Sequence, residues 1–121
     1  MLRSALLATL RAWAAIRGTQ PPYGVVRVRF LPELLRPYTV YLIGEVHHRW
    51  FAAMDCPCGC SSVVQLSILT TGRPRWTVAE HWTGTVTIHP SIQRTTGCRS
   101  HYFVRRGRIL WVPVLATSMT S

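Results

Sequence analysis

Residues 101–112 read HYFVRRGRILWV, two short apolar-rich segments on either side of the dipeptide Arg106-Gly107. A two-residue connection that contains glycine is typical of a β-hairpin, because glycine adopts the positive φ that such tight turns require. The stretch therefore predicts antiparallel strands at 101–105 and 108–112.

Upstream of this hairpin, Val26, Val28 and Phe30 alternate with Arg27 and Arg29. Alternation with a period of two predicts a half-buried strand with a basic outer face. Further strands are expected at 39–46, 63–69, 75–79 and 83–88, with a short segment at 50–54, a turn at 71–74 and a strand end at His89-Pro90. Short strands separated by regular turn signals favour a mainly β fold, a small antiparallel β domain.

Residues 2–17 have a different period, which predicts a helix. Leu2, Leu6, Leu10 and Trp13 recur at helical spacing, and Gly18 is expected to end the helix. Three interpretations of this helix stay open: packing on its own domain, docking on a partner subunit, or an Arg-rich targeting segment. The predicted organisation is an N-terminal helix at 1–18, a zinc-binding β domain at 19–115 and a tail at 116–121, with fraying from Pro113.

Length and composition narrow the class of protein. A chain of 121 residues, 48% of them apolar, predicts one compact domain and excludes a two-domain enzyme. The mean hydropathy is +0.15, and no apolar run approaches the roughly 20 residues of a membrane span, so we expect a soluble chain. All 14 basic side chains are Arg, against 4 acidic ones, which gives a formal charge of +10.

The cysteines are clustered, unlike those of a disulfide framework. Three lie within the five residues Cys56-Pro57-Cys58-Gly59-Cys60, and the fourth is Cys98. A disulfide across a Cys-x-Cys spacing is strained, whereas thiolate ligands of one metal ion tolerate that spacing. Residues 5–10 are too short for a secretory signal before Arg11 interrupts them, so we expect reduced thiols and a cytoplasmic location.

The spacing of the cysteines predicts a zinc-binding turn cluster, because zinc prefers thiolate and imidazole ligands presented by tight turns. Five candidates compete for four places, and they are Cys56, Cys58, Cys60, Cys98 and His101. We expect the four cysteines to be the chief ligands. The alternatives are a redox dithiol, or small buried side chains beside an ordinary histidine.

Several motifs together carry a family resemblance. They are Cys56-Pro-Cys58-Gly-Cys60, Trp76, the stretch TVTIHPSI at 85–92 and the stretch GCRSHYFVRRGRI at 97–109. With these motifs, residues 50–112 resemble a bacterial domain-of-unknown-function family of predicted metal-binding peptidases, whose members are encoded beside ubiquitin-like proteins and their activating and conjugating enzymes. The resemblance implies a peptidase that processes a ubiquitin-like modifier or removes it from its targets.

Two chemistries are compatible with that activity. If zinc is structural, a hydroxyl nucleophile would act with His101 as its base. Ser91 and Ser100 are the candidates, and Ser91 is the better partner because strand neighbours such as Ser100 and His101 point to opposite faces. A catalytic zinc would need a carboxylate as general base, and the carboxylates available are Glu33, Glu45, Asp55 and Glu80. None of them stands in an H-E-x-x-H motif, so the serine-type mechanism is favoured.

Two other classes of function remain as alternatives. One is a non-enzymatic zinc-binding adaptor in the same pathway. The other is a basic nucleic-acid-binding module, whose surface would combine Arg27, Arg29, Arg73, Arg75, Arg94, Arg99, Arg105, Arg106 and Arg108 with Trp76, Tyr102, Phe103 and Trp111. The complete absence of Lys argues against selection for phosphate contacts, and a basic surface equally attracts an acidic protein.

Overall fold

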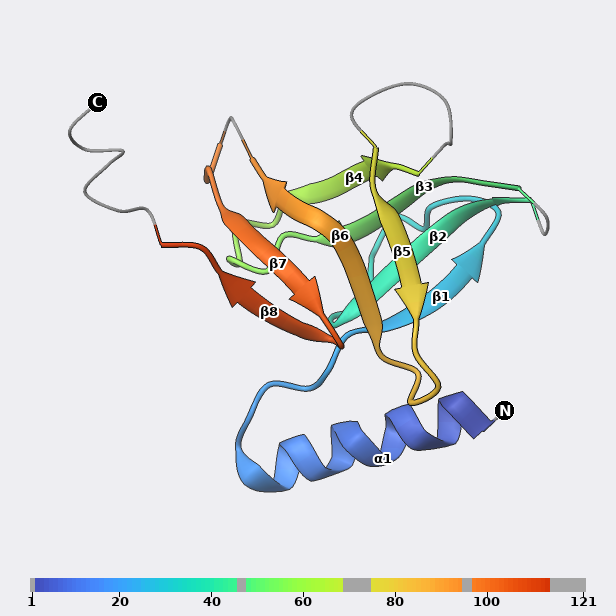
Figure 1. Cartoon of the computed structure of the whole chain (residues 1–121), viewed down its shortest axis with the longest axis vertical. Helices are drawn as coiled ribbons and strands as arrows, with labels where there is room; N and C mark the ends of the chain where they lie inside the picture. Colours follow the sequence, from blue (N-terminus) through green and yellow to red (C-terminus); the bar gives the residue numbers. More distant parts are fainter. Residues whose placement is uncertain (1, 46–47, 69–74, 95–96, 114–121) are drawn as a thin grey trace.

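The computed structural model describes residues 2–45, 48–68, 75–94 and 97–113, which form one helix and two four-stranded sheets (Figure 1). Helix α1 comprises Leu2–Arg17, and the first sheet consists of β1 (Gly24–Val28), β2 (Thr39–Glu45), β3 (His48–Asp55) and β4 (Val63–Ser67). The second sheet consists of β5 (Thr77–Glu80), β6 (Val86–Gln93), β7 (His101–Arg105) and β8 (Arg108–Trp111). The predicted mainly β fold with one N-terminal helix is therefore confirmed.

One strand pair departs from the expected antiparallel arrangement. β1 and β2 are parallel, since residues 29–38 carry the chain back along the sheet before β2 begins, whereas the other neighbouring strands are antiparallel. Phe30, predicted to lie on the inner face of the first strand, follows the end of β1 at Val28 and is 80% exposed. That part of the prediction was wrong, because the strand ends two residues before Phe30.

The core lies between the two sheets. Side chains from β2, β3 and β4 meet side chains from β6 and β7 in one apolar cluster, which contains Val40, Leu42, Ala52, Met54, Val64, Leu66, Val86, Ile88, Ile92, Tyr102 and Val104. Alternate residues of β4 and β7 are buried, as expected of strands that cover a core with one face.

Strand β6 continues past the position where the sequence predicted its end. Ile88 pairs with Val104 and Ile92 pairs with Tyr102, so three residues of β6 lie opposite a single residue of β7. Such an irregularity accommodates Pro90 within a strand, because the extra residues leave the regular ladder of hydrogen bonds. His89-Pro90 is therefore part of a bulge and not a strand end, and the bulge also contains Ser91.

Helix α1 has the predicted bounds, and Gly18 follows it with φ of 70°. The face it packs on the sheets differs from the predicted Leu6-Leu10-Trp13 stripe. Ala14 is buried and Arg11 donates hydrogen bonds to the carbonyls of Pro22 and Tyr38, while Leu10 and Trp13 stay exposed. Gly24 permits this seating, because a Cβ there would collide with Leu7. The side chain of Leu2 lies outside the described ones.

Some predicted features fall on residues that the structure does not describe: the ends of two expected strands at Val46 and Leu69, the turn at 71–74, and the tail at 116–121. In the part of the chain that is described, no helix is long and apolar enough to cross a membrane.

The β7–β8 hairpin forms at Arg106-Gly107 as predicted, with positive φ at both residues. Its backbone also joins other elements, because Gly107 donates to the carbonyl of Val86 and accepts a hydrogen bond from the amide of Tyr23. A Cβ on Gly107 would lie 2.9 Å from Pro22 and 3.0 Å from the Tyr23 backbone.

We expect Gly107→Ala to lower the free energy of unfolding by roughly 2 to 4 kcal/mol, because it combines a left-handed backbone with overpacking. The matched control is Gly18→Ala, where φ is also positive but nothing lies within 4 Å of the added Cβ. This control should lose only about 1 kcal/mol. Urea unfolding of both variants measures the difference, and equal losses would contradict the proposed packing.

Candidate functional site

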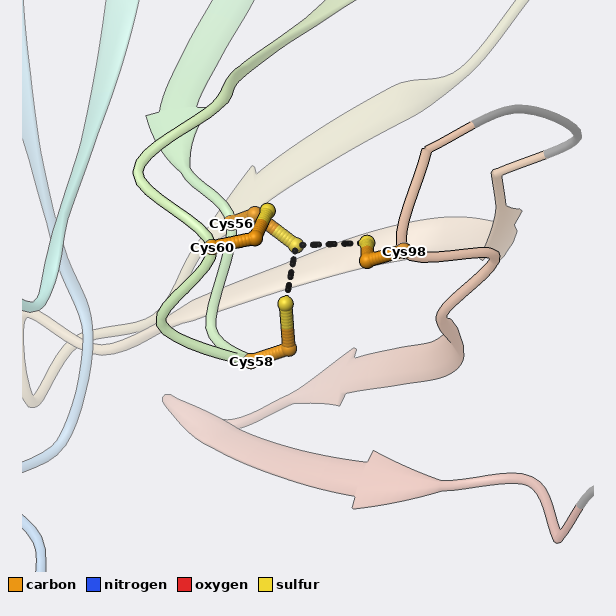
Figure 2. A group of neighbouring side chains, drawn as sticks. All are labelled: Cys56, Cys58, Cys60 and Cys98. Atoms are coloured by element: carbon orange, nitrogen blue, oxygen red, sulfur yellow. Dashed lines mark hydrogen bonds between the residues drawn. The ribbon is translucent and has the colours of Figure 1, made fainter.

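The four cysteines lie close together at one side of the two packed sheets, where a connection of each sheet approaches the other (Figure 2). Cys56, Cys58 and Cys60 come from the connection between β3 and β4, and Cys98 comes from the connection between β6 and β7. The Sγ atom of Cys56 lies 3.4 Å from that of Cys58 and 3.6 Å from that of Cys98. The four sulfur atoms all lie within 4.8 Å of one another.

A tight turn brings the first three cysteines together. The amide of Gly59 donates to the carbonyl of Cys56, and the amide of Cys56 donates to the carbonyl of Ser62. Gly59 has φ of 87°, a conformation that glycine adopts without steric cost. The turn that the spacing of the cysteines predicted is therefore present, and Gly59 makes its backbone conformation possible.

The pKa values of these thiols differ because their surroundings differ. Burial raises the pKa of the Cys56 thiol to about 11. The Ser100 hydroxyl, 3.1 Å from the Sγ atom of Cys98, hydrogen-bonds the thiolate and lowers the pKa of Cys98 to about 6. A hydrogen bond from Ser62 lowers the pKa of Cys60. Cys98 therefore carries thiolate character near neutral pH, the form in which a cysteine binds a metal ion.

The donor set is suited to a metal ion. In a tetrahedral zinc site with Zn–S bonds of about 2.3 Å, neighbouring sulfurs are separated by about 3.8 Å, close to the distances found here. Four thiolates around a divalent ion carry a net negative charge. The guanidinium of Arg94 lies 3.8 Å from the sulfur of Cys60 and 3.9 Å from that of Cys98, where it partly offsets this charge. The cluster can therefore hold a metal ion.

A second pair of side chains lies on β6 and β7. The Nε2 atom of His101 is 3.0 Å from the Oγ atom of Ser91, within hydrogen-bond distance. His101 begins β7, and Ser91 occupies the bulge of β6. Both side chains are partly buried. This is the spacing of a hydroxyl nucleophile and a general base.

The other candidate serine is placed elsewhere. The Oγ atom of Ser100 lies 3.1 Å from the Sγ atom of Cys98 and 3.9 Å from that of Cys56, so Ser100 faces the thiol cluster. His101, the next residue, contacts Ser91 instead. Ser100 and His101 are adjacent in the chain but contact two different groups of side chains. This is expected where a chain enters a strand, because successive side chains point to opposite sides.

Neither His101 nor a carboxylate joins the cysteines. Among the described residues, the group with metal-binding geometry contains the four cysteines alone. Of the carboxylates considered for a catalytic zinc, Glu45 pairs with Arg29 at 3.1 Å and Glu80 pairs with Arg27 at 2.8 Å. Within the described ranges no carboxylate hydrogen-bonds the His101 ring, which leaves a pair and not a triad.

The surface expected for stacking nucleic-acid bases is incomplete. Tyr102 is 0% exposed and belongs to the core, so it is not available to a base. Arg27 and Arg29 form ion pairs, and Arg73 lies outside the described residues.

Trp76 has a structural role that the sequence pattern did not assign. Its indole Nε1 donates a hydrogen bond to the carbonyl of Ser91 at 3.2 Å. The residue contributed to the family resemblance, but no spacing rule predicts a bond between an indole and a backbone carbonyl 15 positions away. The contacts of Ser62 and Arg94 with the cysteines were missed for the same reason.

Comparison with known proteins gives one match. The model of the family described as bacterial ubiquitination-like system serine protease (BubE) matches residues 27–112. The search of curated proteins and the search of solved structures returned no match.

We expect one zinc ion per chain, bound by Cys56, Cys58, Cys60 and Cys98, because four sulfur ligands within 4.8 Å of one another suit that ion. Elemental analysis by mass spectrometry measures it, and Cys98→Ser should reduce the zinc content at least tenfold. Structural zinc contributes on the order of 10 kcal/mol in small domains, so chelation should also lower thermal stability. The control Ser67→Ala, on β4, should retain zinc. A metal-free chain with unchanged stability would refute the expectation.

Proposed function

The chain belongs to the family of bacterial ubiquitination-like system serine proteases, and from this premise we propose that it hydrolyses the acyl bond at the C-terminus of a ubiquitin-like protein. Ser91 is the proposed nucleophile and His101 the proposed general base. The contact of 3.0 Å between Ser91 Oγ and His101 Nε2 is the observation that carries the proposal. This activity would process a precursor of the modifier or release the modifier from its targets.

The chemistry follows the general scheme of serine acyl transfer. His101 Nε2 accepts the proton of Ser91 as Oγ attacks the scissile carbonyl, which becomes a tetrahedral intermediate. The protonated imidazole then gives its proton to the leaving amine, the bond to that amine breaks, and an ester between Ser91 and the modifier remains. Water, deprotonated by the same imidazole, cleaves the ester and restores Ser91. No metal ion takes part in these steps.

The position of Ser91 depends on its surroundings. In a regular strand, successive side chains point to alternate faces of the sheet. The bulge of β6 interrupts this alternation at Ser91. The hydrogen bond from Trp76 to the Ser91 carbonyl holds the backbone of the bulge. Trp76 thus acts as a positioning residue, since it contacts the backbone and not the reacting atoms.

Zinc at the thiol cluster has a structural part in this proposal. Cys98 precedes His101 by three residues, and the segment between them runs directly into β7. A metal ion at the four cysteines would tie this segment to the β3–β4 connection. It would thereby restrict the backbone from which His101 projects, as precise positioning of a base requires.

The exposed face of α1 is the proposed contact with a second protein of the same system. Leu10, Trp13 and Ile16 are exposed, Ile16 by 80%. Adjacent exposed apolar side chains on a helix are a common feature of interaction surfaces. Two alternatives remain: a non-enzymatic adaptor and a nucleic-acid-binding module. Absence of hydrolysis in the experiments below would favour these alternatives.

We expect Ser91→Ala and His101→Ala each to lower the rate of cleavage of a ubiquitin-like precursor by at least about a thousandfold, with zinc content unchanged. Ser100→Ala should reduce activity only in proportion to any zinc it loses, because its hydroxyl contacts sulfur. A fluorophosphonate probe, mapped by mass spectrometry, should label Ser91. If Ser91→Ala keeps full activity, or if His101→Ala loses zinc together with activity, the assigned roles are wrong.

Ile16→Asp should abolish co-purification with the partner protein while changing the free energy of unfolding by less than about 0.5 kcal/mol, because the side chain is exposed. Tandem affinity purification of the full chain with its neighbouring gene products measures the contact. Phe30→Asp, at an equally exposed site outside the helix, is the control and should keep the partner. Loss of the partner with both variants would show that the helix face has no special part.

A further inference from the structure

A groove lies between α1, the connection of β5 to β6 and the β7–β8 turn, with a volume of about 690 Å³. Its size is that of sites which take several side chains or a drug-sized molecule. In Figure 1 these segments lie together at the end of the molecule next to the helix, away from the β6–β7 connection that carries Cys98.

The groove combines apolar side chains with cations. Leu10 and Ala14 of α1 line it together with the rings of Trp13 and Trp82, which are 56% and 71% exposed. Exposed tryptophans are enriched at binding sites, where their large surface is buried by a partner.

Three guanidinium groups border the same groove. Arg17 follows Trp13 along the helix, Arg106 lies in the hairpin turn and Arg108 begins β8. None of the described residues that line the groove is acidic. A ligand is therefore expected to bring negative charge for the arginines and an apolar group for the tryptophans.

We propose that this groove binds an acidic segment of a partner protein, one that carries carboxylates beside a large apolar side chain. The inference rests on the proposed contact of α1 with a second protein and names the chemistry of that protein. It does not depend on hydrolysis at Ser91.

Two other occupants are disfavoured by the structure. A second copy of this chain offers few carboxylates, and two of its 4 acidic residues, Glu45 and Glu80, already pair with arginines. Nucleic acid would need free aromatic faces for its bases. The guanidinium of Arg17 lies 5.6 Å from the centre of the Trp13 ring and covers one side of it, which reduces the aromatic surface open to bases, and part of the groove wall is aliphatic.

The groove is separate from the proposed catalytic pair but joined to it by β7. His101 begins this strand and Arg105 ends it, so roughly 13 Å separates the pair from the turn that carries Arg106.

Isothermal titration with the full-length protein and an unlabelled twelve-residue peptide of alternating Glu and Leu tests the inference. We expect saturable binding, at least about tenfold weaker for the same peptide with Gln in place of Glu. Arg108→Ala and Trp82→Ala should each weaken binding of the acidic peptide by about tenfold. The matched controls Arg36→Ala and Phe30→Ala, exposed and outside the groove, should change it less than twofold.

Several outcomes would overturn the proposal. They are the absence of binding at millimolar peptide, equal binding of the neutral peptide, and equal weakening by the control variants. A twelve-nucleotide oligothymidylate is the probe for nucleic acid. If it binds more tightly than the acidic peptide, and if Trp82→Ala abolishes that binding, the groove is a nucleic-acid site and the proposal is wrong. Binding retained in Ser91→Ala supports a site independent of hydrolysis. If Ile16→Asp releases the partner while the groove variants still bind the peptide like wild type, the groove inference fails and the helix contact stands.

Discussion

The burial of two apolar sheet faces against each other is the contact on which the rest of this structure depends. Side chains such as Met54 of β3 and Tyr102 of β7 are almost fully enclosed between the layers. Cys56 belongs to this core and also to the thiol cluster, which places the cluster at the margin of the packed interior. The cysteines from the two sheets meet because packing has already brought the β3–β4 and β6–β7 connections together.

The pair of strands β6 and β7 connects the core, the thiol cluster and the proposed catalytic pair. Ile92 and Tyr102 face the core, Ser100 faces the sulfurs, and His101 faces Ser91. Residues of β6, of β7 and of their connection thus contact three different environments, because successive side chains of a strand point to opposite sides. The bulge of β6 allows Ser91 to reach His101 despite the proline before it.

The arginines have distinct surroundings, so the formal charge of +10 is not one uniform surface. Arg27 and Arg29 meet carboxylates, Arg11 holds backbone carbonyls beneath the helix, and Arg94 lies against the sulfurs. The guanidiniums at the groove near α1 are placed instead beside exposed tryptophans. Local context, and not net charge, therefore distinguishes a structural arginine from one available to a partner.

The sequence by itself determined the helix at 2–17, the hairpin at Arg106-Gly107, the mainly β class and the candidate metal ligands, since periodicity, glycine turns and cysteine spacing act over a few residues. It also named Ser91 and His101 as candidates. The tertiary structure alone decided the parallel pairing of β1 with β2, the helix face that is buried and the continuation of β6 through Pro90. These features depend on contacts between segments far apart in the chain, and such contacts leave no local pattern.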